Sequence, residues 1–129
     1  MKAHVLVAED DAPTLALVAT ALERAGYTVT RAEDGDELLQ ALADGSQFDL
    51  VVTDISMPWM TGLQVAHSVR AAGLKTPVIV MTALPIDASK VEALGSHAVL
   101  LRKPFGTKEL VTAVREVLQG ARADEHAPS

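Results

Sequence analysis

Short apolar runs alternate with amphipathic stretches along the whole chain. The runs, rich in β-branched residues, cover residues 4–8, 28–31, 49–53, 77–81 and 98–101. The best of them are apolar at successive positions, as strands must be when helices cover both faces of a parallel sheet. The stretches that follow them carry apolar residues at helical spacing and cover residues 13–25, 36–44, 62–72, 87–94 and 107–119. The alternation predicts five consecutive strand–helix units.

This repetition restricts the topology. A helical connection between two parallel strands is almost always right-handed, which lets successive helices cover both faces of one sheet. We therefore expect an α/β fold: a doubly wound, open sheet of five parallel strands of the flavodoxin-like kind. A chain of 129 residues suffices for one such domain with its own core. We assign residues 3–120 to this domain and expect 121–129, which are small and polar, to form a disordered tail.

Local signals mark the ends of the first and last predicted helices. Pro13 suits a first helical turn and Gly26 suits the position after a helix end. Thr107 is placed to cap the last helix. The apolar stripe expected on the first helix consists of Leu15, Leu17, Val18, Ala21, Leu22 and Ala25.

The composition excludes several classes of function. Cysteine is absent, so disulfides, thiolate metal sites and thiol nucleophiles are ruled out. With 17 acidic against 11 basic residues the formal net charge is −6, and no cluster of lysine and arginine is available to bind phosphate backbones. We therefore expect no direct binding of nucleic acid. The chain shows neither a secretory signal nor an apolar stretch of membrane-spanning length, so we expect a cytoplasmic protein that does not insert into membranes.

Acidic residues follow two of the predicted strands. Glu9, Asp10 and Asp11 come after the first strand, and Asp54 comes at the end of the third. Ligands of doubly wound sheets bind outside the carboxyl ends of the strands, so these carboxylates should converge there. Carboxylates a few ångströms apart repel one another and require a proton, a cationic side chain or a metal ion. Mg²⁺ suits such a cluster best, because it takes oxygen ligands and commonly leaves positions open for a phosphoryl group.

Two further polar residues come at the ends of the remaining strands. Thr82 ends the fourth strand and Lys103 follows the fifth. Together with the acids they describe a phosphoryl-transfer site, in which Asp54 is the nucleophile, Thr82 hydrogen-bonds a phosphoryl oxygen, and Lys103 and the metal neutralise the charge. Each residue alone has a simpler explanation as a helix cap, a turn residue or a solvated side chain. Their joint placement favours the site.

Four segments in this order resemble the receiver domain of two-component response regulators, the CheY-like family. They are EDD at 9–11, DISMPWMTG at 54–62, MTA at 81–83 and KPF at 103–105, and the likeness covers about residues 3–120. The resemblance implies that a histidine kinase or a phosphotransfer protein phosphorylates Asp54. It also implies that Thr82 is the switch residue and that Lys103 is the partner of the phosphoryl group.

The resemblance further implies a metal ion and a signalling surface. Mg²⁺ or Mn²⁺ would be bound by Asp10, Asp54 and the main-chain carbonyl of Ser56, with Glu9 acting through water. Asp11 lies just outside the pair of acids that the family uses. A downstream protein target would bind the surface formed by the fourth predicted helix, the fifth strand and the fifth helix, and the bond from Lys103 to Pro104 would be cis.

The chain also departs from the family pattern. Leu100 stands where members usually carry an aromatic ring that moves with the threonine, and the stretch from 82 to 95 is shorter than in common members. The fourth predicted helix and its partner surface are therefore expected to be unusual. Both a monomer and a homodimer are compatible with the sequence, as are a stand-alone regulator and a domain of a longer protein.

Three other functions compete with this interpretation. An aspartyl-phosphate hydrolase would carry a second aspartate two residues after the nucleophile, where this chain has Ser56. A flavodoxin would bind a flavin phosphate in the loop after the first strand, where the three acids would repel it. A phosphorylation-independent interaction module of the same shape remains as the third alternative, which we rank below a working receiver because the reactive residues are present.

Overall fold

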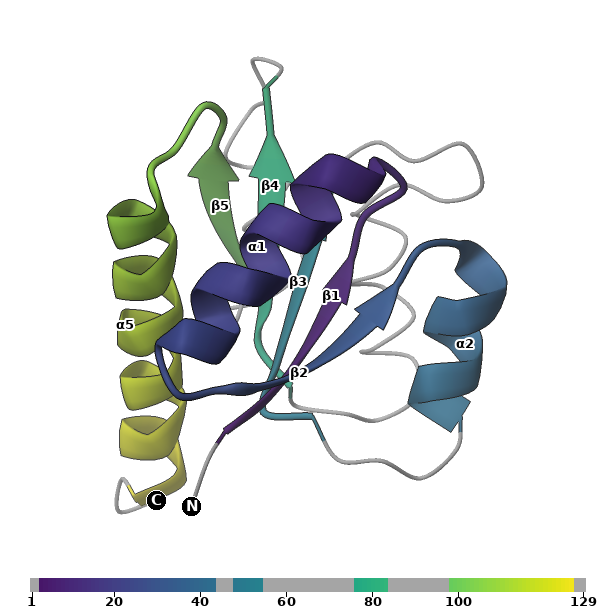
Figure 1. Ribbon diagram of the computed structural model, residues 1–129. Helices are drawn as coiled ribbons and strands as arrows, with labels where there is room; N and C mark the ends of the chain where they lie inside the picture. The colour runs from purple at the N-terminus through teal and green to yellow at the C-terminus, as the bar shows by residue number, and fades with distance from the viewer. Residues whose placement is uncertain (1–2, 44–47, 55–75, 84–97, 127–129) are drawn as a thin grey trace.

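One parallel sheet forms the centre of the molecule. The computed structural model describes residues 3–43, 48–54, 76–83 and 98–126 (Figure 1). The strands are β1 (His4–Ala8), β2 (Thr28–Ala32), β3 (Leu50–Asp54), β4 (Val78–Thr82) and β5 (Ala98–Arg102). They lie in the order β2-β1-β3-β4-β5, and every neighbouring pair is parallel. The strand order reverses between β1 and β3, as in doubly wound sheets, and the fold expected from the sequence is confirmed.

Helices cover both faces of this sheet. Helices α1 (Ala12–Arg24) and α5 (Thr107–His126) lie side by side on one face, and α2 (Gly35–Ala43) lies on the other (Figure 1). The predicted helices at 62–72 and 87–94 fall outside the described residues. Among the described residues, no helix is both long and apolar enough to cross a lipid bilayer.

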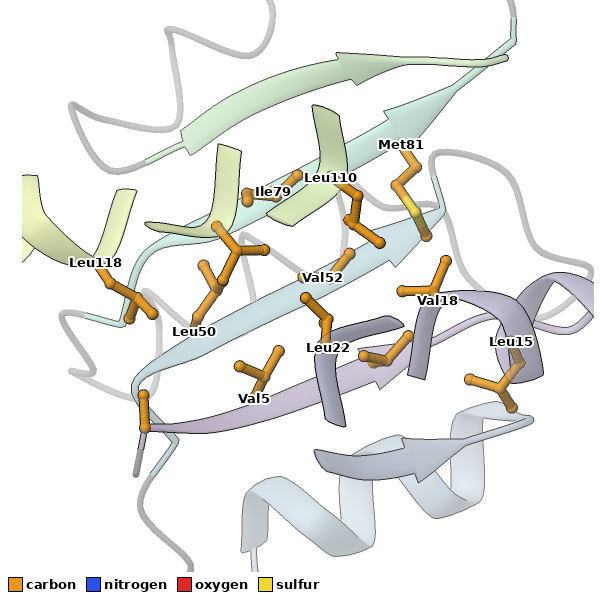
Figure 2. Close-up of a cluster of buried hydrophobic side chains, with 13 residues drawn as sticks. Val5, Leu15, Val18, Leu22, Leu50, Val52, Ile79, Met81, Leu110 and Leu118 are labelled. Atoms are coloured by element: carbon orange, nitrogen blue, oxygen red, sulfur yellow. The ribbon is translucent and has the colours of Figure 1, made fainter. Parts of the chain in front are cut away.

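The apolar strands supply two cores, one for each face. Successive side chains of a strand point to opposite faces, so Val5 and Val7 of β1 join the cluster beneath α1 and α5 (Figure 2). Leu6 and Ala8 join the second cluster, which includes Leu38 of α2. Because both faces are buried, a strand can be apolar throughout, which explains why the apolar runs of the sequence identify the strands so well.

The strand boundaries differ slightly from the predicted ones. Strands β3 and β4 each begin and end one residue later than expected, while β2 and β5 extend one residue further. Asp54 and Thr82, which the sequence analysis places at strand ends, are the last residues of the adjacent strands β3 and β4. The sheet therefore fixes the backbones of Asp54 and Thr82 up to its carboxyl edge.

Local capping explains where α1 begins and ends. Asp11 is the N-cap, and its side chain accepts the backbone N–H of Thr14 at 3.1 Å. At the other end Gly26 has a φ of +102°, which favours glycine, and the N–H of Tyr27 reaches back to the carbonyl of Leu22. The N–H of Gly26 also reaches back to the carbonyl of Glu23, and these two bonds at the end of α1 form a Schellman motif. The predicted roles of Pro13 in the first turn and Gly26 after the last turn are confirmed.

The buried face of α1 differs from the predicted stripe. The buried side chains are Leu15, Val18, Ala19 and Leu22. Leu17, which the sequence analysis includes in the stripe, is 55% exposed. A position next to Val18 lies about 100° around the helix from it, so Leu17 sits at the border of the buried face rather than within it.

Helix α5 corrects two expectations. Its first intrahelical bond runs from the N–H of Leu110 to the carbonyl of Gly106, and Glu109 accepts the N–H of Gly106, so Gly106 rather than Thr107 occupies the cap position. The helical backbone continues to His126, past the end predicted at 119. Gly120 does not adopt a positive φ and therefore does not terminate the helix, and the following segment contains the good helix formers Ala121 and Ala123. The boundaries 3–120 and 121–129 stay predictions.

Candidate functional site

Two neighbouring strands bring three carboxylates together at the carboxyl edge of the sheet. Ala8 of β1 pairs in register with Thr53 of β3, so the residues that follow them are adjacent in space. Each of Glu9, Asp10 and Asp54 offers a carboxylate oxygen that lies within 4.8 Å of those of the other two. The predicted convergence of these acids is therefore present in the structure.

The three carboxylates differ sharply in exposure. Glu9 is buried with 1% of its surface exposed, Asp54 is half-buried, and Asp10 is exposed. Burial and the nearby charge of Asp54 raise the pKa of Glu9 to about 7, while the N–H of Asp11 and the charge of Lys103 act in the opposite direction. The cluster thus has one carboxylate inside the protein and an open side at Asp10.

Hydrogen bonds hold the buried carboxylate in place. Oε1 of Glu9 accepts the backbone N–H of Asp11 at 3.1 Å, and Oε2 lies 3.3 Å from Nζ of Lys103. Both oxygens of Glu9 therefore have a donor inside the protein, as a buried charged group requires. The backbone of Glu9 is also anchored, because its N–H donates to the carbonyl of Ala32 at 3.1 Å.

Asp11 has a structural role that separates it from the cluster. Its carboxylate accepts both the backbone N–H and the hydroxyl of Thr14. These two hydrogen bonds, that of the hydroxyl first, lower the pKa of Asp11. One of the three consecutive acids is therefore a helix cap, which is the simpler explanation that the sequence allowed for a single acid but not for all of them.

Lys103 bridges two carboxylates of the site. Its Nζ lies 3.3 Å from Oε2 of Glu9 and 3.4 Å from Oδ2 of Asp54. The backbone N–H of Lys103 donates to the carbonyl of Thr82 at 2.6 Å, and the Lys103–Pro104 peptide bond is cis, as the family resemblance implies. Among the described residues Lys103 forms no ion pair with Asp10, so the exposed side of the cluster is not covered by the ammonium.

Thr82 and Leu100 lie close to this edge in the sheet. Thr82 is buried, ends β4 and stands beside Asp54, because Asp54 pairs with the preceding residue Met81. Leu100 is half-buried, pairs with Val80 and packs against the core cluster on the α2 face. The remaining predicted ligand, the main-chain carbonyl of Ser56, lies outside the described residues, as does Trp59.

Sequence reasoning missed one ion pair of the site. It assigned Lys103 to the phosphoryl group and did not pair it with Glu9, which lies 94 positions away in the chain. The signal was available in principle, because a buried glutamate at a strand end needs a cationic or donor partner. Only the strand order, however, reveals which lysine reaches it.

The arrangement is suited to hold a hard cation and to expose a nucleophile. The three carboxylates lie close enough together to bind one ion between them. Carboxylate oxygens are the ligands that divalent ions such as Mg²⁺ take. Asp54 combines this environment with a side chain that is 15% exposed and therefore reachable from solvent. An ammonium beside it can stabilise added negative charge.

Comparison with known proteins identifies the class. Residues 5–115 match the family described as the response regulator receiver domain. The chain is 35% identical over 119 residues to the uncharacterized transcriptional regulatory protein YkoG of Bacillus subtilis (strain 168), covering 92% of this chain and 52% of that protein. It is 34% identical over 126 residues to the response regulator MprA of Mycobacterium sp. (strain KMS), covering 97% and 54%. The chain thus spans about half the length of these curated relatives.

Solved structures agree with this result. The chemotaxis protein CheY4 of Vibrio cholerae superimposes with a TM-score of 0.81 at 30% sequence identity, covering 91% of this chain and 99% of that one. The receiver domain of the Francisella response regulator 1452 gives a TM-score of 0.81 at 32% identity, covering 93% and 99%. The chain therefore belongs to the response regulator receiver domain family of two-component signalling. It is a signalling phosphoacceptor domain rather than an enzyme.

Proposed function

We propose that this receiver domain accepts a phosphoryl group on Asp54 from the phosphohistidine of a histidine kinase or a phosphotransfer protein. The observation that carries the proposal is the meeting of Glu9, Asp10 and Asp54 within 4.8 Å, with Nζ of Lys103 only 3.4 Å from Oδ2 of Asp54. The phosphoryl group of such phosphohistidine donors comes from ATP, which is consistent with a cytoplasmic location of this domain. The phosphorylated domain then signals to a downstream protein.

A divalent cation is part of the proposal. Asp10, Asp54 and the main-chain carbonyl of Ser56 would hold Mg²⁺ or Mn²⁺, and Glu9 would act through a bound water. The exposed position of Asp10 supports this assignment, because it leaves a side of the cluster that the ion can enter. When bound, the ion supplies positive charge next to the phosphoryl oxygens.

The transfer requires a single covalent step from the protein. One carboxylate oxygen of Asp54 forms a bond to phosphorus as the phosphorus–nitrogen bond of the donor breaks, and the departing imidazole nitrogen takes up a proton. The product is an acyl phosphate. Lys103 supports the reaction because its ammonium already contacts the reacting carboxylate and can hydrogen-bond an added phosphoryl oxygen.

Signalling would follow from a change in the packing of the ends of β4 and β5. The added charge on Asp54 would draw the Thr82 hydroxyl and the Lys103 ammonium towards it. The hydrogen bond between the Thr82 carbonyl and the Lys103 N–H supports a joint movement, since it ties the two strand ends together. The phosphoryl group shifts the balance only as far as it favours one packing over the other.

The surface that reports this change would comprise the predicted helix at 87–94, β5 and α5. Leu100 stands on this surface in place of the aromatic ring usual in the family, and it packs half-buried on the core beside Val80. We propose that a change of leucine packing replaces the movement of a ring.

Intact mass spectrometry tests the proposal. The protein is incubated with acetyl phosphate in the presence of Mg²⁺, and we expect the mass to rise by one phosphoryl group. The same treatment with a chelator, or of Asp54→Asn, should leave the mass unchanged. No phosphorylation of the wild-type protein under any of these conditions would instead favour a phosphorylation-independent interaction module.

A further inference from the structure

Within the described part of the chain, the buried polar or charged side chains are those of Glu9, Thr53 and Thr82. Glu9 belongs to the carboxylate cluster, and Thr82 is the predicted switch residue. Thr53 has neither role, although it directly precedes Asp54 in the chain and is fully buried. The hydroxyl of Thr53 is therefore a buried polar group beside the nucleophile that the proposed transfer does not use.

The side chain of Thr53 lies among apolar residues. β3 is the middle strand of the sheet (Figure 1), and Thr53 pairs in register with Ala8 of β1 and with Val80 of β4. Both partners belong to the apolar cluster on the α2 face, as does Val51, which stands two residues earlier in β3. Side chains two residues apart in a strand share a face, so Thr53 points towards the same cluster.

Packing alone would favour valine at this position. Valine and threonine are both β-branched, and valine would place a methyl group in the apolar cluster where threonine places a hydroxyl. A hydroxyl withdrawn from water destabilises the folded state unless it forms a hydrogen bond inside the protein. The presence of threonine at position 53 is therefore explained by the bond that its hydroxyl forms and not by the space that it fills.

The partner of this hydroxyl is the main chain of the nucleophile. Oγ1 of Thr53 donates to the carbonyl oxygen of Asp54 at 3.1 Å. β3 ends at Asp54, so the hydrogen bond restrains this carbonyl at the point where the strand ends. Because the backbone has only two soft torsions per residue, fixing the carbonyl restricts the main-chain conformation of Asp54.

The main-chain conformation of Asp54 determines where its carboxylate points. Successive side chains of a strand point to opposite faces, so Thr53 reaches the nucleophile through the main chain and not through the carboxylate. That carboxylate lies 3.4 Å from Nζ of Lys103 and within 4.8 Å of the carboxylates of Glu9 and Asp10. A change in the backbone torsions of Asp54 would shift its carboxylate relative to the ammonium and to the other two acids.

We propose that Thr53 is a positioning residue for the phosphoacceptor. Its buried hydroxyl holds the main chain of Asp54 so that the carboxylate meets both the metal ion and the incoming phosphorus. Thr53 itself cannot contact a phosphodonor, because no part of it is exposed. The inference rests on the proposed function for the transfer step, whereas its effect on the carboxylate cluster is measured without phosphorylation.

Two substitutions at this position separate the hydroxyl from the methyl group. Thr53→Val keeps the branched shape and removes the hydrogen bond, while Thr53→Ser keeps the hydroxyl and removes the methyl group. If the hydroxyl positions Asp54, Thr53→Val keeps a thermal midpoint near that of the wild-type protein but is phosphorylated more slowly, and Thr53→Ser shows the reverse. If Thr53 only fills space, Thr53→Ser is the impaired variant in both measurements.

The first measurement is the rate of phosphorylation. Each protein is treated with acetyl phosphate at saturating Mg²⁺, at a temperature where all variants are folded, and the intact mass is followed with time. We expect the rate constant to fall about tenfold in Thr53→Val and to stay within about twofold of the wild-type value in Thr53→Ser. Val51→Ala is the matched control, because it removes apolar volume from the same face of β3 and leaves the hydrogen bond in place. It should lower the thermal midpoint and leave the rate close to that of the wild-type protein.

The second measurement is the affinity for Mg²⁺, determined by calorimetry on proteins that have met no phosphodonor. Asp54 is one of the proposed ligands, so Thr53→Val should weaken binding at least about threefold, whereas Thr53→Ser and Val51→Ala should not. This measurement does not depend on the transfer. If the wild-type protein takes up no phosphoryl group, the proposed function fails, and the Mg²⁺ affinities alone decide the role of Thr53.

Several results would overturn the inference. Equal rates and equal Mg²⁺ affinities in the wild-type protein and Thr53→Val would show that the hydroxyl does not position Asp54. A Thr53→Ser or Val51→Ala protein as slow as Thr53→Val would show that the loss follows packing and not the hydrogen bond. Absence of Mg²⁺ binding to the wild-type protein would remove the ion that the carboxylate is proposed to meet.

Discussion

The Nζ atom of Lys103 lies 3.3 Å from Oε2 of Glu9, a carboxylate with only 1% of its side chain exposed. The same nitrogen lies 3.4 Å from Oδ2 of Asp54. A single ammonium therefore offsets the repulsion between a buried acid and the proposed nucleophile. This arrangement links the stability of the domain to the charge state of its site.

Removal of the ammonium should destabilise the metal-free protein. In Lys103→Met, Glu9 and Asp54 lose the cation that lies between them, and we expect the free energy of unfolding to fall by about 1 to 2 kcal/mol in a chelator. Saturating Mg²⁺ should reduce this loss, because the ion supplies the missing positive charge and binds only the folded site. Urea unfolding with and without Mg²⁺ measures both values. An equal loss under the two conditions would show that the lysine acts through packing and not through charge.

The stability of the metal-free protein should depend on the protonation of Glu9. Burial raises the pKa of Glu9 from its ordinary value of 4.5 to about 7 in the folded state, so the folded protein holds this proton more tightly than the unfolded chain. The contribution of this proton to the free energy of unfolding is full below pH 4.5 and is lost as the pH rises through 7. Relative to Glu9→Gln, which cannot ionise, the wild-type protein should therefore lose on the order of 2 kcal/mol between these values.

Urea unfolding at a series of pH values in a chelator checks this prediction. Mg²⁺ should flatten or reverse the difference between the two proteins, because a bound cation favours the ionised carboxylate. Profiles for wild type and Glu9→Gln that run parallel throughout would contradict the assigned environment of Glu9.

Divalent ions should bind at Asp10 and not at Asp11. Mg²⁺ at millimolar concentration is expected to change the fluorescence of Trp59, the single tryptophan of the chain, which follows Asp54 by five positions. Asp10→Asn removes one charged ligand and should weaken the response at least about tenfold. A fluorescence titration of the two proteins decides the matter. An undiminished response in Asp10→Asn would remove Asp10 from the site.

Asp11→Ala provides the complementary case. It removes the N-cap of α1, so we expect a loss of about 1 kcal/mol in the free energy of unfolding. The fluorescence response to Mg²⁺ should stay close to that of the wild-type protein, because the Asp11 carboxylate accepts hydrogen bonds from Thr14 outside the cluster. If Asp11→Ala instead kept the wild-type stability but lost the response to Mg²⁺, Asp11 would be the metal ligand and not the helix cap.

The sequence was sufficient to predict the sheet, for a definite physical reason. Both faces of the strands are buried, so β1, β3 and β4 are apolar along most of their length. Polar residues stand at their carboxyl edge, because Glu9 follows Ala8 and because Asp54 and Thr82 end β3 and β4. Since parallel strands bring all these ends to one edge, the cluster of acids could be predicted without coordinates.

The different roles of the three consecutive acids could not be predicted from the sequence in the same way. Glu9, Asp10 and Asp11 are neighbours with similar chemistry, and their different roles depend on the turn between β1 and α1. Only that turn buries Glu9, exposes Asp10 and directs Asp11 to the N–H of Thr14. Helical spacing places Leu17 at the border of the buried face of α1, and only the packing of α1 in the fold determines that it is 55% exposed there.

The most direct test of the central claim is to identify the residue that carries the phosphoryl group. After treatment with acetyl phosphate and Mg²⁺, borohydride reduces an aspartyl phosphate to homoserine, which peptide mass spectrometry locates. We predict homoserine at position 54 alone, and none after omission of Mg²⁺. Homoserine at position 10 or 11, or an Asp54→Asn protein that is labelled as well as the wild type, would contradict the account.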